Sequence, residues 1–554
     1  MPAPKPLTQC DPPALDWSRP GTPAASDFGD IYFSVDGGLE ETETVFLKGC
    51  GLPEGWQGRR RFVIGELGFG SGLNFLAAWR MWEATKPKNG RLHFVSVEKF
   101  PFDAAQLKRA LSAWPELKIF SAALIAQWPG RVKGFHRLHF GDVTLTLIHD
   151  DIANGLDSLD AKVDAWFLDG FSPAKNPDMW SSEIMKKLAS LSAPSARLAT
   201  FTVAGTVRQA LSEAGFQVEK KEGFGRKRHR LEARYPGERD IEKNIEAPTI
   251  IGAGIAGASL VKAFAWRGII PNVIHDPDHK AASHNAAALV KPRLDLQDRP
   301  ESRFFLGSYL YALSAYQDMT VMTGVSHIPK TEAESKRFEK LAGQAPLPPE
   351  HFSFDVANNI LALSRSLIIE PKQILKDWLS LGALSTDKPI KEGLMLLAAG
   401  YGLKELLKGC DIKLRFSRGQ LTWANGDIDA PVTYGGYALP LNNRLLLGAT
   451  HQRLDGEDPF ALKHEDDASN LKNFKTYTGI TAHPSELPSR ASVRVTTADT
   501  LPMLGEIDEK LWLFSGLGSR GFVFAPLLAE AIVSKICGDP LPVSKTLWAR
   551  FGLR

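Results

Sequence analysis

Short apolar runs alternate with segments of helical spacing over the first 235 residues of the chain. Buried strands are predicted at 61–67, 92–97, 143–148, 163–168 and 197–202. Apolar residues recur every three or four positions at 73–84, 103–113, 182–191 and 207–214, which predicts helices. Strands that alternate with helices indicate an α/β fold, with a doubly wound parallel sheet that is covered by helices on both faces.

A polar segment bracketed by prolines, YPGERDIEKNIEAP, separates the two halves of the chain. We expect a first domain at 1–235, a linker at 236–247 and a second domain at 248–554. The second domain begins with a strand at Thr249–Ile251 and a glycine loop, and the same order returns in the tail from Leu511. Between them, about 320–485 mixes short strands with turns, which indicates an inserted mixed α+β substrate domain.

Composition limits the possible classes without defining one. The chain has 554 residues, 44% of them apolar, and a net charge of only +3. Its four cysteines are far apart and form no C-x-x-C pair, which argues against a zinc site and fits a reducing cytoplasm. No apolar run reaches the roughly 18 residues of a membrane span. We therefore expect a cytoplasmic protein without a metal.

Because the net charge is small, a nucleic-acid surface must be a local patch. The densest basic segment is GFGRKRHRLEAR, which contains Arg226, Lys227, Arg228, Arg230 and Arg234. These residues are candidates for phosphate contacts. The alternative is a solvated strand edge that is protected by its charge.

The first glycine loop, E-L-G-F-G-S-G, follows the predicted strand at 61–67. Gly68, Gly70 and Gly72 let a ligand pass close to the backbone, in a spacing that differs from the dinucleotide pattern. S-adenosylmethionine has no phosphate, and its ammonium and ribose hydroxyls need acidic or carbonyl acceptors. The candidate acceptors are Glu66 for the ammonium, Glu98 for the ribose and Asp151 for the adenine amino group. The alternative is a tight turn beside surface acids.

A second polar loop, D-G-F-S-P-A-K-N-P, follows the predicted strand at 163–168. In open α/β sheets, ligands bind at the carboxyl ends of the strands. Asp169 and Asn176 are therefore expected beside a methyl acceptor, where Asp169 could orient an amine or take its proton. The alternative is a helix-entry loop capped by polar side chains. Together the two loops predict a Rossmann-like methyltransferase domain.

Residues 27–48 and the segments ELGFGSGLNFL, VDAWFLDGFSPAKNPDMW and GFGRKRHR together resemble the methyltransferase domain of the MnmC family. The resemblance implies a bifunctional enzyme that modifies the wobble uridine of bacterial tRNA, with an aminomethyl group as the methyl acceptor. It also implies that Asp30, Tyr32 and Phe33 belong to the acceptor side of the pocket. Tyr32 or Phe33 could stack on the base, or both could be core aromatics.

The second glycine loop, G-A-G-I-A-G, fits the dinucleotide pattern directly after a strand. Gly252, Gly254 and Gly257 would let a pyrophosphate approach the next helix, and Asp276 stands where a ribose-binding acid is expected. A further glycine loop in the tail favours FAD over a nicotinamide, because a flavin dinucleotide is held along its whole length. The tail loop supplies the candidates Gly516, Gly518, Arg520 and Gly521. An earlier loop, which is expected to contact the phosphate and the ring, supplies Ser283 and Asn285.

Residues 248–554 resemble the D-amino-acid oxidase superfamily and the C-terminal domain of the MnmC family. In the matching segment, RASVRVTTADTLP, the position of Arg494 holds the substrate carboxylate in that superfamily, as the fork of a guanidinium can. The alternative for Arg494 is a salt bridge with Asp499 or another acid. The chain departs from the family at His284 and at the basic segment Lys291-Pro-Arg293, which affects substrate detail.

The resemblance implies two successive reactions on tRNA. The FAD domain would remove the carboxymethyl group of 5-carboxymethylaminomethyl(-2-thio)uridine as glyoxylate, with oxygen as the electron acceptor. The other domain would then methylate the exposed amine with S-adenosylmethionine. The motifs alone leave open a small-molecule amine as substrate, and also a cofactor-binding scaffold without turnover.

Overall fold

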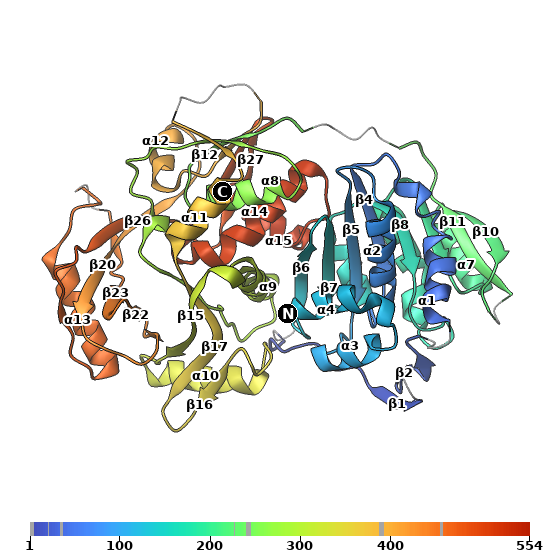
Figure 1. Cartoon of the computed structure of the whole chain (residues 1–554), viewed down its shortest axis with the longest axis horizontal. Coiled ribbons are helices and arrows are strands. Elements are labelled where there is room, and N and C mark those ends of the chain that lie inside the picture. The colour runs from blue at the N-terminus through green and yellow to red at the C-terminus, as the bar shows by residue number, and fades with distance from the viewer. Residues whose placement is uncertain are drawn as a thin grey trace. The chain divides into compact units, whose positions relative to one another are not determined.

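The structure is a computed structural model that describes residues 5–19, 22–33, 37–225, 228–239, 245–386, 393–454 and 458–554. It contains two compact units (Figure 1). The N-terminal unit comprises Gln9–Asn244 and Ser534–Thr546, and the C-terminal unit comprises Met1–Thr8, Ile245–Val533 and Leu547–Arg554. Among the helices within these described ranges, none is long and apolar enough to cross a membrane.

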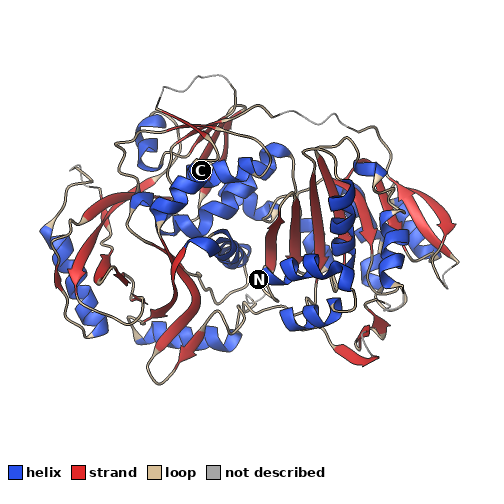
Figure 2. Ribbon diagram, viewed as in Figure 1, coloured by secondary structure: helices blue, strands red, loops and turns tan. Residues whose placement is uncertain are grey.

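The N-terminal unit is built on an eight-stranded sheet in the order β10-β11-β9-β8-β4-β5-β7-β6. Figure 2 shows its strands as red arrows with helices beside them. The strands are β4 (Arg61–Leu67), β5 (Arg91–Glu98), β6 (Gly134–Phe140), β7 (Val143–His149), β8 (Val163–Leu168), β9 (Ser192–Thr200), β10 (Gln217–Glu222) and β11 (His229–Arg234). The strands from β9 to β7 in this order are parallel, and the outer pairs are antiparallel. The carboxyl ends of β4, β5 and β8 therefore meet at one edge.

Alternate side chains of the central strands point to opposite faces of this sheet. Phe62 and Ile64 pack into a buried cluster with the helices α2 (Leu73–Thr85), α3 (Ala104–Leu111) and α4 (Lys118–Ala126). Val63 packs into a second cluster on the other face, with α5 (Ile152–Ser158), α6 (Ser182–Leu191) and α7 (Gly205–Glu213). The structure confirms the predicted doubly wound α/β fold.

A small antiparallel sheet precedes this core. It is formed by β1 (Leu15–Arg19), β2 (Thr22–Ala25) and β3 (Asp30–Ile31). The backbone N–H of Ser172 donates to Asp30 Oδ2 at 3.1 Å, which links β3 to the loop that follows β8. This bond brings residues that are far apart in the sequence to one edge of the large sheet.

The C-terminal unit contains a six-stranded sheet in the order β18-β13-β12-β19-β28-β27. Its strands are β12 (Thr249–Ile251), β13 (Asn272–Ile274), β18 (Ala383–Ser385), β19 (Met395–Leu397), β27 (Met503–Asp508) and β28 (Leu511–Ser515). The helix α8 (Ile255–Ala265) follows β12, and α14 (Gly521–Cys537) begins soon after β28. A buried ion pair joins Arg267, just after α8, to Glu530 of α14 at 2.8 Å.

An eleven-stranded mixed sheet forms the rest of the C-terminal unit. It includes β14 (Ala288–Val290), β15 (Thr320–His327), β17 (Ile360–Ile369), β20 (Arg415–Asn425), β21 (Val432–Thr433), β22 (Tyr437–Leu441), β23 (Arg444–Gly448) and β26 (Arg490–Thr496). The helices α10 (Glu332–Gln344) and α13 (His464–Thr478) accompany it. The chain passes between the two sheets several times, so side chains from distant segments can share one cavity.

Gly65 in β4 offers a test of core packing. A Cβ atom added there would lie 2.4 Å from Cζ3 of Trp166, a buried ring whose Nε1–H donates to Ser192 Oγ at 3.0 Å. Gly65→Ala should therefore lower the free energy of unfolding of the N-terminal unit by about 1–3 kcal/mol, as overpacking does. Urea denaturation measures this loss. The control is Gly205→Ala in α7, where nothing lies within 4 Å of the added atom; equal midpoints for the two variants would contradict this packing.

Candidate active sites

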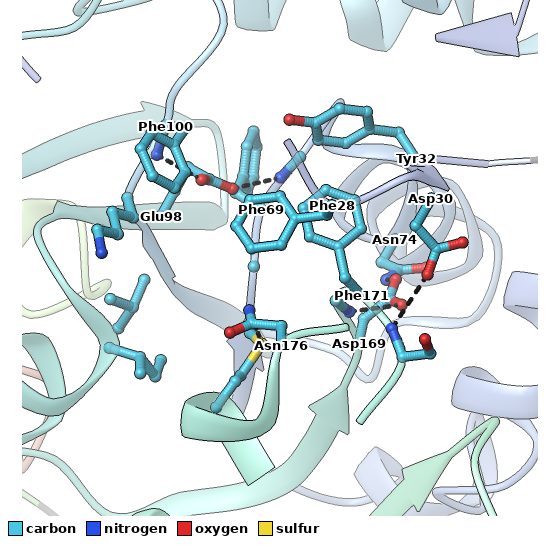
Figure 3. A pocket seen from close by; sticks show the side chains of 18 of the residues that line it. Phe28, Asp30, Tyr32, Phe69, Asn74, Glu98, Phe100, Asp169, Phe171 and Asn176 are labelled. Carbon is cyan, nitrogen blue, oxygen red and sulfur yellow. Dashed lines mark hydrogen bonds between the residues drawn. The ribbon is translucent and has the colours of Figure 1, made fainter. Parts of the chain in front are cut away.

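A cavity of about 870 Å³ lies at the carboxyl ends of β4, β5 and β8 (Figure 3). Most of the residues predicted for the methyltransferase site line it, namely Asp30, Tyr32, Phe33, Gly68, Gly70, Glu98, Asp151, Asp169 and Asn176. Glu66 is fully buried behind this wall. The structure therefore brings together the two loops that the sequence analysis treated separately.

The glycine loop adopts a backbone that side chains disfavour. Gly68, Gly70 and Gly72 have φ angles of 82°, 52° and 77°. At Gly70 an added Cβ would lie 3.2 Å from the ring of Tyr32. Glu98 fixes this loop, because its Oε2 accepts the N–H of Gly70 at 2.8 Å. Its other oxygen, Oε1, accepts the N–H of Phe100 at 2.7 Å, so both oxygens of Glu98 are bonded to the backbone beside the cavity.

An amide lies between two carboxylates under the loop. Asn74 Nδ2, in α2, donates to Asp169 Oδ2 at 2.7 Å (Figure 3). The same nitrogen donates to Glu66 Oε1 at 2.9 Å. Thr42 Oγ1 donates to Asn74 Oδ1 at 2.8 Å, which fixes the orientation of the amide. Ser96 Oγ donates to the other oxygen of Glu66 at 2.7 Å. Burial, with a smaller contribution from the charge of Asp169, raises the pKa of Glu66 well above its ordinary value.

Aromatic rings line part of the cavity. Phe28 stacks on Phe171 with centroids 4.5 Å apart, and the edge of Tyr32 meets Phe171 at 5.3 Å (Figure 3). Phe33 is buried, and its ring meets Trp114 at 4.5 Å. Both rings lie on the cavity wall, but this packing favours a core role for Phe33, whereas Tyr32 is only partly buried.

The remaining predicted residues of this unit differ in their surroundings. Asp151 caps α5 by accepting the N–H of Ala153 at 3.0 Å, and it pairs with Lys99 at 3.4 Å. Arg228 is exposed. Arg226 and Lys227 lie outside the described residues. Arg230, in the same basic segment, pairs with Glu232 at 2.6 Å.

A second cavity, of about 650 Å³, lies in the C-terminal unit. The residues predicted for the flavin and its substrate that line it are Gly252, Gly254, Ser283, Asn285, Arg494, Gly516, Gly518, Arg520 and Gly521. Gly257 lies behind the loop, where an added Cβ would be only 1.8 Å from the carbonyl oxygen of Gly252. Asp276 is exposed, does not line the cavity and accepts the N–H of Asp278 at 2.9 Å.

Two loops of this cavity are held by residues that the sequence analysis did not single out for that role. Ser283 Oγ accepts the N–H of Ile255 at 3.0 Å, at the start of α8. Arg490 of β26 donates to Asn285 Oδ1, and also to the carbonyl oxygen of Ala281 at 2.8 Å. In the sequence, Arg490 stands only at the edge of the motif around Arg494. Its role depends on β26 meeting a loop about 200 residues earlier, which no local pattern reveals.

Arg494 projects from β26 into the same cavity. Its Nη1 donates to the carbonyl oxygen of Thr450 at 3.3 Å, and a Cβ added at Gly419 would lie 2.6 Å from that nitrogen. Asp499 pairs instead with Arg554 at 2.8 Å, so the predicted alternative of an Arg494–Asp499 salt bridge is wrong. Burial lowers the pKa of Arg494. Burial also raises the pKa of its neighbour Tyr437 to about 12, although Arg494 opposes that rise.

Comparison with known families defines the class of this protein. Residues 115–236 match a family model described as S-adenosyl-L-methionine-dependent methyltransferase, and residues 381–535 match one described as FAD dependent oxidoreductase. The chain is thus a methyltransferase fused to an oxidoreductase, and S-adenosylmethionine and FAD are its cofactors. The two cavities fit these ligands, since the first combines a glycine loop with carboxylates and the second combines two glycine loops with cationic side chains.

Two curated relatives identify the family. A protein of Maricaulis maris is 39% identical over 97% of this chain and 95% of its own length. A protein of Caulobacter vibrioides is 40% identical over 98% of this chain and 97% of its own length. Both are named tRNA 5-methylaminomethyl-2-thiouridine biosynthesis bifunctional protein MnmC. The chain belongs to the MnmC family.

The raised pKa of Glu66 predicts a pH-dependent stability that Glu66→Gln removes. The folded unit holds this proton at pH values where the unfolded chain, with an ordinary pKa of 4.5, has lost it. The contribution of Glu66 is thus fully present below about pH 4.5 and is lost as pH rises through the raised pKa. Relative to the wild type, Glu66→Gln should therefore become more stable from pH 5 to pH 8.5. Urea midpoints of the two proteins that stay parallel over this range would contradict the prediction.

Proposed function

We propose that the chain modifies the wobble uridine of tRNA in two steps. The C-terminal unit removes the carboxymethyl group of 5-carboxymethylaminomethyl(-2-thio)uridine, and the N-terminal unit then methylates the exposed 5-aminomethyl group. The observation that carries this proposal is that one chain, similar over 97% of its length to a relative of the MnmC family, holds both cavities. The relatives' name refers to tRNA, which supports tRNA as the substrate here.

In the oxidative step, Arg494 binds the substrate carboxylate. A buried guanidinium suits this role, because its fork gives two parallel hydrogen bonds and its charge is poorly screened. Gly419 leaves room for the guanidinium, and Thr450 orients it. When bound, FAD would accept the hydride that leaves a C–H bond of the methylene carbon between the carboxylate and the amine. Water then hydrolyses the substrate imine to glyoxylate and the 5-aminomethyl uridine, and we propose that oxygen takes up the electrons.

In the methylation step, Asp169 orients the primary amine and accepts its proton. Asn74 keeps this carboxylate in place and separates it from Glu66. Glu98, on the cavity wall, would accept the ribose hydroxyls of S-adenosylmethionine, which supplies the methyl group, whereas Glu66 is buried behind the wall and accepts from Asn74 and Ser96. Methyl transfer is an in-line displacement, so positioning supplies most of the rate. Tyr32, over Gly70, is placed to cover the donor or to stack on the base.

A small-molecule amine could also bind in the two cavities. A measurement of tRNA binding therefore distinguishes a tRNA substrate from a small-molecule substrate. Phosphate contacts weaken steeply with salt. In a gel-shift assay, we expect the chain to retard the migration of tRNA at low salt and to release the tRNA as the salt concentration rises. Arg228 is a candidate contact, because it is exposed whereas Arg230 is paired with Glu232.

Two single substitutions test the assignment of the two cavities. Asp169→Asn should lower the methylation rate about 10²–10⁴-fold, as the loss of a general base does, and should leave oxidation intact. The mass spectrum of tRNA nucleosides should then show the 5-aminomethyl form. Arg494→Gln should instead leave the carboxymethylaminomethyl form unprocessed, because its carboxylate loses its partner.

Each of these variants is the control for the other. Both should bind S-adenosylmethionine and FAD, which excludes unfolding as the cause of a loss. The assignment is wrong if the two variants accumulate the same nucleoside.

A further inference from the structure

Lys291 forms part of the wall of the second cavity, in the C-terminal unit, which Arg494 also lines. It follows β14 directly, in the basic segment where the sequence departs from the family. Its Nζ lies 3.4 Å from His327 Nδ1, on β15, and 3.4 Å from Thr433 Oγ1, on β21. Three segments that are distant in the sequence therefore hold one amine at a defined place in the cavity.

The groups around Lys291 are mainly cationic. Arg520 faces it from the tail loop and Glu334 from α10, and among the described residues no carboxylate forms an ion pair with it. Burial, aided by the charge of Arg520 and partly opposed by that of Glu334, lowers the pKa of Lys291 to about 8. The other titratable or charged side chains that line this cavity are His279, Lys280, Lys330, Tyr401, Tyr437, His451 and Arg494. The site therefore disfavours the ammonium form of Lys291 relative to that of an exposed lysine.

His327 is a hydrogen-bond acceptor for Lys291. Burial, with the charges of Lys291, Arg337 and Lys330, lowers the pKa of His327 to about 3, so its imidazole is neutral. Its Nε2 lies 3.8 Å from Glu334 Oε1, which favours the tautomer that carries the proton on Nε2. Nδ1 then has a lone pair to accept an N–H of Lys291.

This arrangement leaves one direction free on the lysine nitrogen. A neutral amine has two hydrogens and one lone pair. When both hydrogens are donated, to His327 Nδ1 and Thr433 Oγ1, the lone pair occupies a remaining tetrahedral position. Such a nitrogen, on a cavity wall, is placed to act as a base toward a ligand in the cavity.

The proposed substrate needs such a base. A carboxymethylaminomethyl group carries a secondary amine, which is an ammonium in water at neutral pH. The nitrogen must lose one proton before its lone pair can form the C=N bond of the imine. Arg494 binds the carboxylate of the same glycine-like group, so the amine is two bonds from an atom already held in this cavity.

We propose that Lys291 is the proton acceptor for the substrate amine, and that His327 and Thr433 position its nitrogen. The role rests on the proposed function. The proton passes from the substrate nitrogen to Lys291 Nζ, which becomes an ammonium. The pair of electrons left on the substrate nitrogen forms the C=N bond as hydride leaves the adjacent carbon for bound FAD.

The test compares the full-length, FAD-loaded wild type with Lys291→Met, and with Lys336→Met as the control. Lys336 is an exposed lysine on α10 that pairs only with Glu332 in the described structure. Flavin reduction by tRNA that carries 5-carboxymethylaminomethyluridine is followed without oxygen from pH 6.5 to 9.5. We expect Lys291→Met to be at least about 100-fold slower at pH 7. The deficit should shrink at least about tenfold by pH 9.5, where the substrate amine loses its proton to solvent. Lys336→Met should match the wild type.

A second readout does not depend on turnover. Trace acetylation of the FAD-loaded wild type, quantified by mass spectrometry of the peptide with Lys291, should give a reactivity that rises around pH 8. An ordinary lysine titrates near 10.4. A rise only near that higher value would overturn the proposal. A deficit of Lys291→Met that stays constant with pH, or weaker tRNA binding with unchanged kinetics, would also overturn it and would indicate an anion-binding role.

Failure of the proposed function is a separate result. In that case the wild-type flavin would stay oxidised with this tRNA, and the role of Lys291 would fall with it. If the wild type is reduced and Lys291→Met has the same pH profile, only the role of Lys291 is contradicted.

Discussion

Both cavities depend on the close approach of main chain to main chain where a parallel strand enters a helix. At Gly257 this approach leaves 1.8 Å between an added Cβ and the carbonyl oxygen of Gly252, so no side chain fits. At Gly68, Gly70 and Gly72 the backbone has positive φ angles that L side chains rarely adopt. A ligand can lie against such a backbone, and the side chains that surround it then determine which ligand binds.

The two cavities differ in charge, and that difference suits the proposed order of reactions. Carboxylates such as Glu98 and Asp169 line the first, which suits a donor that is a cation without phosphate. Lys291, Arg494 and Arg520 line the second, which suits a pyrophosphate and a substrate carboxylate. Oxidation removes that carboxylate and leaves a primary amine. The product therefore loses its main attraction to the cationic cavity and becomes suited to the acidic one.

The sequence predicts the positions that belong to one strand and the loop directly after it. Glu66, Glu98, Asp169 and both glycine loops follow this rule, because the end of a buried strand is visible in the apolar pattern. The spacing rule for the ribose acid did not identify a cavity residue, since Asp276 is exposed and bonds to its own turn.

Roles that depend on contacts between distant segments were not visible. Asn74 looks like an ordinary residue in the first turn of α2, and only the fold shows that it joins Glu66 to Asp169. Tyr437 lies on β22, and Lys291 directly follows β14, which is another strand of the large mixed sheet. The lowered pKa of Lys291 and the raised pKa of Tyr437 both follow mainly from burial, which the sequence does not give for single residues.

The most direct test of the account is the order of the two reactions on one nucleoside. Transfer RNA that carries 5-carboxymethylaminomethyl-2-thiouridine is incubated in air with the full-length, FAD-loaded chain, with and without S-adenosylmethionine. Its nucleosides are then identified by mass spectrometry. The account predicts the 5-aminomethyl form when the methyl donor is absent and the 5-methylaminomethyl form when it is present. An unchanged nucleoside in both reactions, or a methyl group added while the carboxymethyl group remains, would contradict it.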